Sequence, residues 1–595
     1  MNCPNCGANN APGAKFCVGC GSNLAAASQQ NAQQYTQQQN VQQPAPVAEP
    51  KKAEAPKVDF GAVKNQLSGI GSSIAAKIKP LLSNKLVLAG VAGGLALLVI
   101  LIVVCSILGG GNGFNKVKTT ILLEQTGKNE YSVIVNKKVL STTIESEGSE
   151  PDLFTSADGS AAAILTDEGE LFVVTGKKLK EVADDVKNCD ISLNGKYLAY
   201  TTKAEDEEEI TLHYCKVSNA KSEEISDEIA GTGDFTIAPN GKSVAYFVAG
   251  DEDEPDELMY FNGKKSTKVA DDGGTLYGMS NGGKEIYVGI GEKVEVDEED
   301  IDVEDYEDYE DYEDLIDGGT KWEYTMYAYD KKGERTNLGT YNNSLYSYIY
   351  FNDDHRQIMF TNEEGKTYIA NKGKKPDEKS SSDQLYLLVP DNSGSSYSNV
   401  TRTITYPVSS LYNQVYQTSG NAVWLIKKNA NKSVKLVAKA SNVQIDASAE
   451  YVYYNYDGEE LRCIKISHGE KASEKYKTIL EDEAPSTYHV TSDRKFVYFV
   501  DEDSVYSVNG KKGGVPKEIA EDLESSITLS GKDVMYYISD GDLYACSNGK
   551  KGKKVASEVN SVGTAATGYT YAFGDDAVYG TTGAKKPKKL VDIDL

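Results

Sequence analysis

The sequence predicts a large all-β region built as a multi-bladed β-propeller, preceded by one membrane-spanning helix and a small cysteine-rich head. Three observations lead to this prediction: a turn-and-strand repeat after residue 118, an uncharged apolar run over residues 86–108, and four cysteines within the first 20 residues. Tyrosine is abundant, with 39 residues, whereas the chain has only four histidines and two tryptophans. This composition favours β-structure and disfavours a metalloenzyme.

The head, residues 1–24, carries two C-x-x-C pairs, and each pair is followed by a glycine. The pairs are Cys3 with Cys6 and Cys17 with Cys20, separated by ten residues. Four thiolates at this spacing predict one tetrahedral Zn²⁺ ion with no open position for chemistry, so the ion is expected to be structural. A redox pair is the alternative, but it needs a surrounding α/β domain that so short a segment cannot supply.

The head resembles the minimal zinc ribbon found at the N-terminus of many bacterial membrane proteins. The matching residues are Cys3-Pro4-Asn5-Cys6-Gly7 together with Gly13, Phe16, Cys17, Cys20 and Gly21. The resemblance covers the head alone and implies a structural zinc ion. Because Lys15 is the single basic residue of the head, nucleic acid is not expected to bind there, and any cytoplasmic partner of the ribbon is expected to be a protein.

Two segments separate the head from the apolar run. Residues 25–59 are mostly Ala, Gln, Asn, Pro and Ser, which predicts a disordered linker. Residues 60–85 place apolar side chains at helical spacing with lysines between them. This pattern is typical of an amphipathic juxtamembrane helix on the inner leaflet, but Gly69, Gly71 and paired serines also allow a loosely helical linker, so both interpretations stay open.

The apolar run from Leu86 to Leu108 holds 23 residues and no charge. A helix of that length reaches about 34 Å, enough to cross a hydrocarbon core of about 30 Å. The run starts far from the N-terminus and lacks an A-x-A cleavage site, so a signal anchor is favoured over a cleaved signal peptide or a buried soluble helix.

Charge on the two sides of the predicted span sets its orientation. Residues 1–110 carry a net charge of +5, while the whole chain is −27, so the part after the span is strongly acidic. The positive-inside rule therefore places the N-terminus in the cytoplasm and the rest outside a plasma membrane that is crossed once. The lysines that precede the span are Lys51, Lys52, Lys57, Lys64, Lys77, Lys79 and Lys85.

After a glycine-rich hinge at residues 109–118, residues 119–595 repeat a turn followed by a strand. Examples are Asn194–Tyr200, Asn240–Tyr246 and Asp493–Tyr498, and adjacent copies are 37 to 46 residues apart. Each copy is followed by a second strand, a lysine-rich turn and a short third strand. Several short strands at a period near 40 predict propeller blades, with eight to ten units between about Phe154 and Leu595. An array of β-sandwiches is the alternative.

The repeat resembles the bacterial TolB-like propellers, in which PDG- and NGK-type turns open the second strand. Here the matching turns are Asn194-Gly195-Lys196 and Asn240-Gly241-Lys242, and the match is local. A strand near Tyr131 to Val139 is a candidate for closing the ring with the C-terminal strands. An acidic insertion at residues 292–318, with repeated Asp, Tyr and Glu, is expected to form an exposed loop. This loop is either merely solvated, or it captures cations weakly or docks a basic partner.

No catalytic residue is predicted. The segment Gly278–Gly282 fits the hydrolase pattern G-x-S-x-G, but Ser280 falls in a repeat turn with no helix after it. The four histidines stand apart in the sequence. The four cysteines after the span are expected to be mostly single buried thiols, with a disulfide pair as the alternative. A site in the propeller funnel is invisible in one sequence, so an envelope hydrolase or lyase stays as the alternative.

Together these features predict a single-pass protein of the bacterial cell envelope with a binding or sensing function. Its propeller is expected to recognise a protein or envelope polymer outside the membrane, without a cofactor other than the zinc ion.

Overall fold

The computed structural model describes residues 117–594 except 204–208, 232, 251–253, 296–319, 342–348, 363, 380–383, 389–407, 419, 429–432 and 566. All of these residues belong to one structural unit, which spans residues 101–595. The predicted zinc ribbon, both linker segments, the span at 86–108 and residues 109–116 of the hinge lie outside them. Within the described ranges, no helix has the length and apolar character needed to cross a bilayer.

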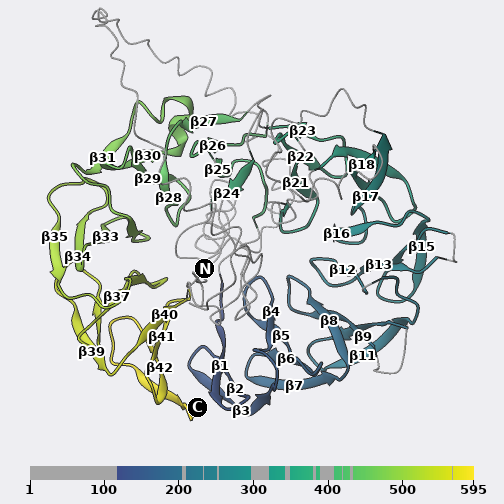
Figure 1. The fold of residues 1–595 in the computed structure, drawn as a ribbon, viewed down its shortest axis with the longest axis horizontal. Coiled ribbons are helices and arrows are strands. Elements are labelled where there is room, and N and C mark those ends of the chain that lie inside the picture. Colours follow the sequence, from purple (N-terminus) through teal and green to yellow (C-terminus); the bar gives the residue numbers. More distant parts are fainter. Residues whose placement is uncertain are drawn as a thin grey trace, which may run out of the picture. The chain divides into compact units, whose positions relative to one another are not determined.

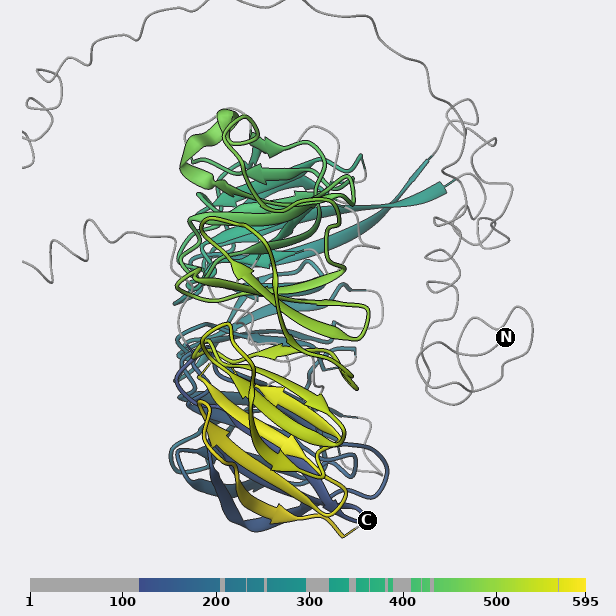
Figure 2. The same cartoon turned by 90° about the vertical axis from the view of Figure 1, so that its left-hand side faces the viewer.

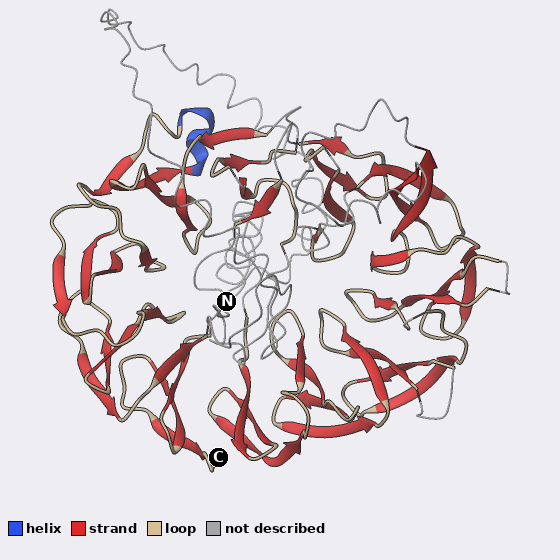
Figure 3. Cartoon of the chain, in the orientation of Figure 1, coloured by secondary structure: helices blue, strands red, loops and turns tan. Residues whose placement is uncertain are grey.

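The described strands form eleven antiparallel sheets arranged around a central axis (Figure 1). Ten sheets have four strands and one has three, and every sheet uses strands that are consecutive in the sequence. This arrangement confirms the predicted all-β, multi-bladed propeller. Within a four-strand blade we name the strands A to D from the axis outwards; Figure 3 shows the same blades as strands joined by short connections.

The first four blades take up residues 121–270. Blade 1 is the three-stranded sheet, and its strands correspond to B, C and D. The strands are β1 (Ile121–Gly127), β2 (Glu130–Val135), β3 (Lys138–Glu145), β4 (Asp152–Thr155), β5 (Ala161–Leu165), β6 (Leu171–Thr175), β7 (Lys178–Ala183), β8 (Val186–Ile191), β9 (Tyr197–Thr202), β10 (Thr211–Lys216), β11 (Lys221–Ser226), β12 (Phe235–Ile237), β13 (Val244–Val248), β14 (Glu257–Phe261) and β15 (Ser266–Ala270).

Blades 5 to 8 follow, and a short 3-10 helix, η5, lies between the last two strands of blade 8. The elements are β16 (Thr275–Met279), β17 (Ile286–Glu295), β18 (Thr320–Tyr329), β19 (Arg335–Thr340), β20 (Tyr350–Phe351), β21 (Gln357–Thr361), β22 (Thr367–Asn371), β23 (Asp377–Glu378), β24 (Leu385–Leu387), β25 (Val415–Thr418), β26 (Val423–Leu425), β27 (Val434–Val437), β28 (Ser441–Ile445), β29 (Tyr451–Tyr456), β30 (Glu460–Lys465), η5 (Ile466–Lys471) and β31 (Lys477–Leu480).

Blades 9 to 11 complete the ring. Their strands are β32 (Thr487–Val490), β33 (Phe496–Asp501), β34 (Ser504–Asn509), β35 (Lys517–Ala520), β36 (Thr528–Leu529), β37 (Met535–Ser539), β38 (Asp542–Cys546), β39 (Lys553–Ser557), β40 (Ser561–Thr564), β41 (Tyr569–Phe573), β42 (Ala577–Thr582) and β43 (Lys588–Asp592).

The hydrophobic core of the described chain is divided among the blade interfaces. Eleven clusters of buried apolar side chains each lie between two consecutive blades. Alternate residues of one strand serve opposite interfaces, because successive side chains of a strand point to opposite faces. In β1, Leu123 packs toward blade 2 and Leu122 toward blade 11. A single blade therefore cannot bury both of its faces alone.

The ring closes between blade 11 and blade 1. Leu122 and Ile134 of blade 1 pack with Tyr571 and Val578 of blade 11. The backbone N–H of Asp594 donates a 2.9 Å hydrogen bond to the carbonyl of Thr126. The segment Tyr131 to Val139, expected to pair with C-terminal strands, instead forms β2 and the start of β3 in a sheet of its own. Closure thus comes mainly from side-chain packing.

Buried tyrosines of strand B tie blades 8, 10 and 11 to the turn between strands C and D of the next blade around the ring. The hydroxyl of Tyr453 donates to the Gly510 carbonyl at 2.8 Å, and that of Tyr536 donates to the Gly583 carbonyl at 2.9 Å. Tyr571 makes the same bond across the closure, to the Asn136 carbonyl at 2.5 Å. This repeated role explains part of the tyrosine abundance of the chain.

Tyr571→Phe is expected to lower the free energy of unfolding by about 1 kcal/mol, because it leaves the Asn136 carbonyl without its buried donor. Tyr579→Phe, on the neighbouring strand β42, is the matched control and is expected to change little. Denaturant unfolding followed by circular dichroism measures both. Equal stability of Tyr571→Phe and the wild type would show that this hydrogen bond does not hold the closure.

Candidate binding surfaces

A recurring six-residue turn joins strands A and B and explains the NGK-type repeat. In Ser192–Tyr197, the backbone N–H of Tyr197 donates to the Ser192 hydroxyl oxygen at 3.2 Å, and the Lys196 N–H donates to Asn194 Oδ1 at 3.0 Å. The fourth residue, Gly195, has φ = 64°, which glycine adopts without a steric cost. The fifth position, here Lys196, is exposed.

Ser280, the serine of the G-x-S-x-G pattern, opens the same turn in blade 5. It is fully buried, and its hydroxyl donates a 2.5 Å hydrogen bond to the carboxylate of Glu285. The backbone N–H of Glu285 donates back to the Ser280 hydroxyl oxygen at 3.0 Å. The structure therefore places Ser280 in a turn-forming role, as the sequence predicts, and not on an exposed nucleophile elbow.

Glu285 also ties blade 5 to blade 6. Its carboxylate is 5% exposed and accepts hydrogen bonds from Nε and Nη2 of Arg356, the latter at 3.1 Å. Arg356 follows His355 in the A–B turn of blade 6, where His355 stacks on Phe351 with ring centroids 4.7 Å apart. Burial lowers the pKa of His355 to about 4. The sequence analysis did not predict this ion pair, because its two residues are 71 positions apart.

The connections between strands C and D carry a marked excess of lysine. Counted between the strand ends, they hold 20 lysines and four acidic residues, and the described lysines among them are exposed. None of these described lysines lies in an ion pair. In blade 3, Lys216 and Lys221 flank the turn. The others include Lys137, Lys177, Lys264, Lys265, Lys331, Lys332, Lys372, Lys427, Lys471, Lys511, Lys512, Lys550, Lys551, Lys585 and Lys586.

The remaining two sets of connections are acidic. Those between strands B and C, and those from strand D to the next blade, together hold 53 acidic residues and five lysines. Fourteen of these acids belong to residues 296–319. Described examples are Asp184 with Asp185, Glu481 to Glu483, and Glu521 with Asp522.

Strand direction puts these two classes of connection on opposite faces of the ring. Because all neighbouring strands in a blade are antiparallel, the A–B and C–D turns share one end, and the B–C and D–A connections share the other. We call the first the lysine face and the second the acidic face. Seen edge-on, the β17–β18 hairpin projects on the acidic side and η5 lies on the other (Figure 2). A strand of five to six residues separates the faces by about 17–20 Å, more than the Debye length of about 8 Å at physiological salt.

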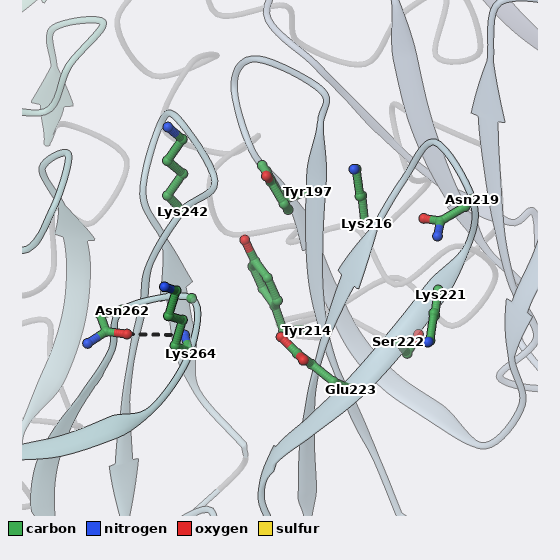
Figure 4. A pocket seen from close by; sticks show the side chains of 11 residues that line it. Tyr197, Tyr214, Lys216, Asn219, Lys221, Ser222, Glu223, Lys242, Asn262 and Lys264 are labelled. Atoms are coloured by element: carbon green, nitrogen blue, oxygen red, sulfur yellow. Dashed lines mark hydrogen bonds between the residues drawn. The ribbon is translucent and has the colours of Figure 1, made fainter.

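A cavity of about 460 Å³ lies on the lysine face between blades 3 and 4 (Figure 4). Lys216 and Lys221 line one side, Lys242 and Lys264 the other. Between them the rings of Tyr197 and Tyr214 stack with centroids 5.3 Å apart. The Tyr214 hydroxyl donates to the Gly241 carbonyl at 2.6 Å, which fixes the ring. The cavity lining contains four lysines and one carboxylate, Glu223, so the cavity is suited to an anionic ligand.

The hairpin β17–β18 extends the acidic face. Its paired residues run from Ile286 with Tyr329 to Glu295 with Thr320. Residues 292–295, which fall in the predicted acidic insertion, are thus strand residues, and the rest of that insertion lies outside the described residues. Trp322 on this arm is 46% exposed and stacks with Tyr324. An exposed tryptophan on a projecting arm is typical of a protein contact site.

One carboxyl group near the ring closure has a strongly raised pKa. Burial, and to a lesser degree the charge of Glu150, raise the pKa of Glu124 to about 7. Glu150 and Asp152 line a separate cavity of about 220 Å³ on the acidic side. A paired carboxyl arrangement of this kind is the feature that a funnel enzyme would need.

The structure gathers no metal-ligating cluster within its described ranges. The predicted zinc ligands Cys3, Cys6, Cys17 and Cys20 lie outside them. The four histidines, His213, His355, His468 and His489, belong to blades 3, 6, 8 and 9, so they do not form a site together.

Cys189, Cys215, Cys463 and Cys546 are buried free thiols, which confirms the expectation of single buried thiols. Burial raises the pKa of Cys463 to about 11 and moves that of Cys189 and Cys215 in the same direction. Because the thiolate is the reactive form, we expect native protein to resist iodoacetamide at all four positions and unfolded protein to react at each. Peptide mass spectrometry measures both; rapid native alkylation would contradict the buried placement.

Comparison with known proteins shows no family for this chain. No protein-family model matches the chain, and no curated protein matches it. Among solved structures, it is similar to a eukaryotic initiation factor, with 10% identity over 68% of this chain and 97% of that one, at a TM-score of 0.33. A putative TolB from Agrobacterium tumefaciens has 12% identity over 44% and 88% of the chains, at a TM-score of 0.25. A prolyl endopeptidase has 14% identity over 61% of this chain and 54% of that one, at a TM-score of 0.28.

Proposed function

We propose that this protein is a membrane-anchored extracytoplasmic binding or sensing protein of the bacterial plasma membrane. Residues 86–108 cross the membrane once, and the propeller lies outside. Cys3, Cys6, Cys17 and Cys20 hold one structural Zn²⁺ in a cytoplasmic ribbon, which offers a docking point for a cytoplasmic protein. The propeller recognises a protein or an envelope polymer.

The acidic face is the observation that carries this proposal. Its described connections hold 30 acidic residues, spread over nine of the eleven blades, and the face adds an arm with the exposed Trp322. A broad field of one sign attracts a cationic partner and raises its rate of association. The ligand that fits this surface is therefore a basic protein or a cationic polymer.

Cross-linking in intact cells that express the full chain tests the proposal. We expect one basic partner to be captured reproducibly, and its yield to fall when Trp322 is replaced by alanine. Tyr476→Ala is the matched control, because Tyr476 is also exposed, at 42%, but lies in the C–D connection of blade 8, on the lysine face. Absence of a partner from the wild-type sample, or equal loss in both variants, would contradict binding through the acidic face.

A hydrolase or lyase acting on the cell envelope is the second candidate, and the raised pKa of Glu124 favours it. A carboxyl group that titrates near pH 7 can serve as a general acid. This alternative predicts turnover of envelope polymers by the full chain and its loss in Glu124→Gln. If the full chain shows no turnover at any pH between 5 and 8, the alternative fails.

A further inference from the structure

We propose that the lysine face rests on the anionic lipid headgroups of the bilayer that holds the anchor, so that the acidic face points away from the membrane toward its ligand. The orientation rests on the proposed anchor, whereas the affinity for anionic lipid rests on the described propeller alone.

The charge of the lysine face is free to act on a partner. Its described C–D lysines are exposed, and no described carboxylate lies within ion-pair distance of any of them. The A–B turns of the same face are close to balanced, since Lys196, Lys242 and Lys495 offset acids such as Asp158 and Asp446. The face as a whole is therefore positive, although the chain is −27.

The distribution of these lysines fits a plane. Lysines lie within or beside the C–D turn of every blade, so the positive charge runs around a closed ring instead of along a track. A bilayer can meet all eleven turns at once, whereas a linear polyanion would have to bend around the ring. Each lysine near an anionic surface adds to the attraction, so a ring of them binds through many weak contacts.

The chain reaches the propeller on this same face. Thr120 immediately precedes β1, and its carbonyl accepts a 2.8 Å hydrogen bond from the N–H of Asn136 in the C–D turn of blade 1. The Lys118 N–H donates to the Asp158 carbonyl in the A–B turn of blade 2, also at 2.8 Å. Residues 109–116 are the eight residues between the proposed span and the described chain, and they can reach at most about 29 Å. The lysine face is therefore the one that this tether keeps near the membrane.

The acidic face does not prevent this docking. The two faces are about 17–20 Å apart, about twice the Debye length, so an anionic bilayer under the lysine face is screened from the acids on the far side. The cavity between blades 3 and 4 opens on the docked face, and its four lysines and two tyrosines offer a place for one phosphate headgroup.

Hydrogen–deuterium exchange on the full chain in nanodiscs tests the proposal. Phosphatidylcholine nanodiscs are compared with nanodiscs that also contain phosphatidylglycerol. Anionic lipid is expected to slow exchange about fivefold in the C–D turns 510–516, 547–552 and 583–587, and high salt should remove the effect. Exchange at 574–576, on the acidic face, should not change.

Two multiple variants separate the faces. Changing Lys511, Lys512, Lys550, Lys551, Lys585 and Lys586 to glutamine should abolish the lipid-dependent protection. The control changes Glu481, Glu483 and Glu521 to glutamine and Asp482 and Asp522 to asparagine, which tolerates the positive φ at both positions, and should keep that protection. Identical exchange in both lipids, protection of the acidic face, or stronger protection by soluble polyphosphate than by lipid would overturn the proposal.

A second experiment distinguishes failure of the proposed span from failure of lipid docking. If alkaline carbonate extracts the chain from membranes, residues 86–108 do not span the bilayer. The same full chain is then mixed with vesicles of the two lipid compositions. If the chain floats with vesicles that contain phosphatidylglycerol but not with pure phosphatidylcholine vesicles, the result supports lipid docking by the lysine face. If it floats with neither kind of vesicle, the result overturns the proposal.

Discussion

Replacing Arg356 by methionine is expected to lower the free energy of unfolding by about 3 kcal/mol at neutral pH. The guanidinium group holds the carboxylate of Glu285, which is 5% exposed, and its removal leaves that carboxylate buried with the Ser280 hydroxyl and its own turn as the remaining partners. Denaturant unfolding at neutral pH measures this loss.

Two further variants test whether the loss comes from leaving the buried carboxylate of Glu285 without its partner. Arg335→Met breaks a 3.0 Å ion pair between two more exposed side chains, Arg335 at 46% and Asp272 at 38%. It should lower the free energy of unfolding by less than about 1 kcal/mol. The double variant Arg356→Met with Glu285→Gln removes the buried charge and should be more stable than Arg356→Met alone. If Arg335→Met and Arg356→Met cost the same, the Glu285–Arg356 pair does not hold blades 5 and 6 together.

Glu124 is expected to lower the free energy of unfolding by as much as about 3 kcal/mol as pH rises from about 5 to 8. Its pKa is raised from the ordinary 4.5 to about 7 in the folded protein. Between those values the folded state holds a proton that the unfolded state has released, so raising the pH favours unfolding. The effect is complete above pH 7 and absent below the unfolded pKa.

Glu124→Gln should remove this contribution to the pH dependence, because glutamine does not titrate. Glu150→Gln should flatten it in part, since burial and not Glu150 is the larger cause of the shift. Glu130→Gln, on the neighbouring strand β2 and exposed, is the control and should leave the slope as in the wild type. Thermal unfolding at a series of pH values measures all four proteins. If stability depends on pH in Glu124→Gln as it does in the wild type, the raised pKa does not belong to Glu124.

The blades were predictable from the sequence because their turns are local. The pattern that begins at Ser192 needs a short polar first residue and a residue that accepts positive φ at the fourth position, here Gly195. Where Arg494, Ala449 or Asp533 stands at the equivalent position, the glycine signal is lost, yet the turn still forms. Ten four-strand blades agree with the upper end of the predicted range. Blade 1 lacks strand A, and its repeat was missed.

The two faces were not predictable in the same way. The lysine-rich turns are visible in the sequence, but which turns share a face depends on how the strands pair. The cavity lined by Lys216 and Lys264 joins turns of two blades, and the Glu285–Arg356 pair joins residues 71 positions apart. These sites depend on contacts between blades, which local patterns do not encode.

One comparison tests most directly the central claim that the two faces have separate roles. Capture of the partner and lipid-dependent hydrogen exchange in the C–D turns are both measured on two variants of the full chain. One is the lysine-face variant with six lysines changed to glutamine, and the other is the acidic-face variant with five acids changed to amides. We predict that the acidic-face variant loses the partner and keeps the lipid effect, and that the lysine-face variant does the reverse. Loss of both properties in both variants, or of neither property in either variant, would contradict the account.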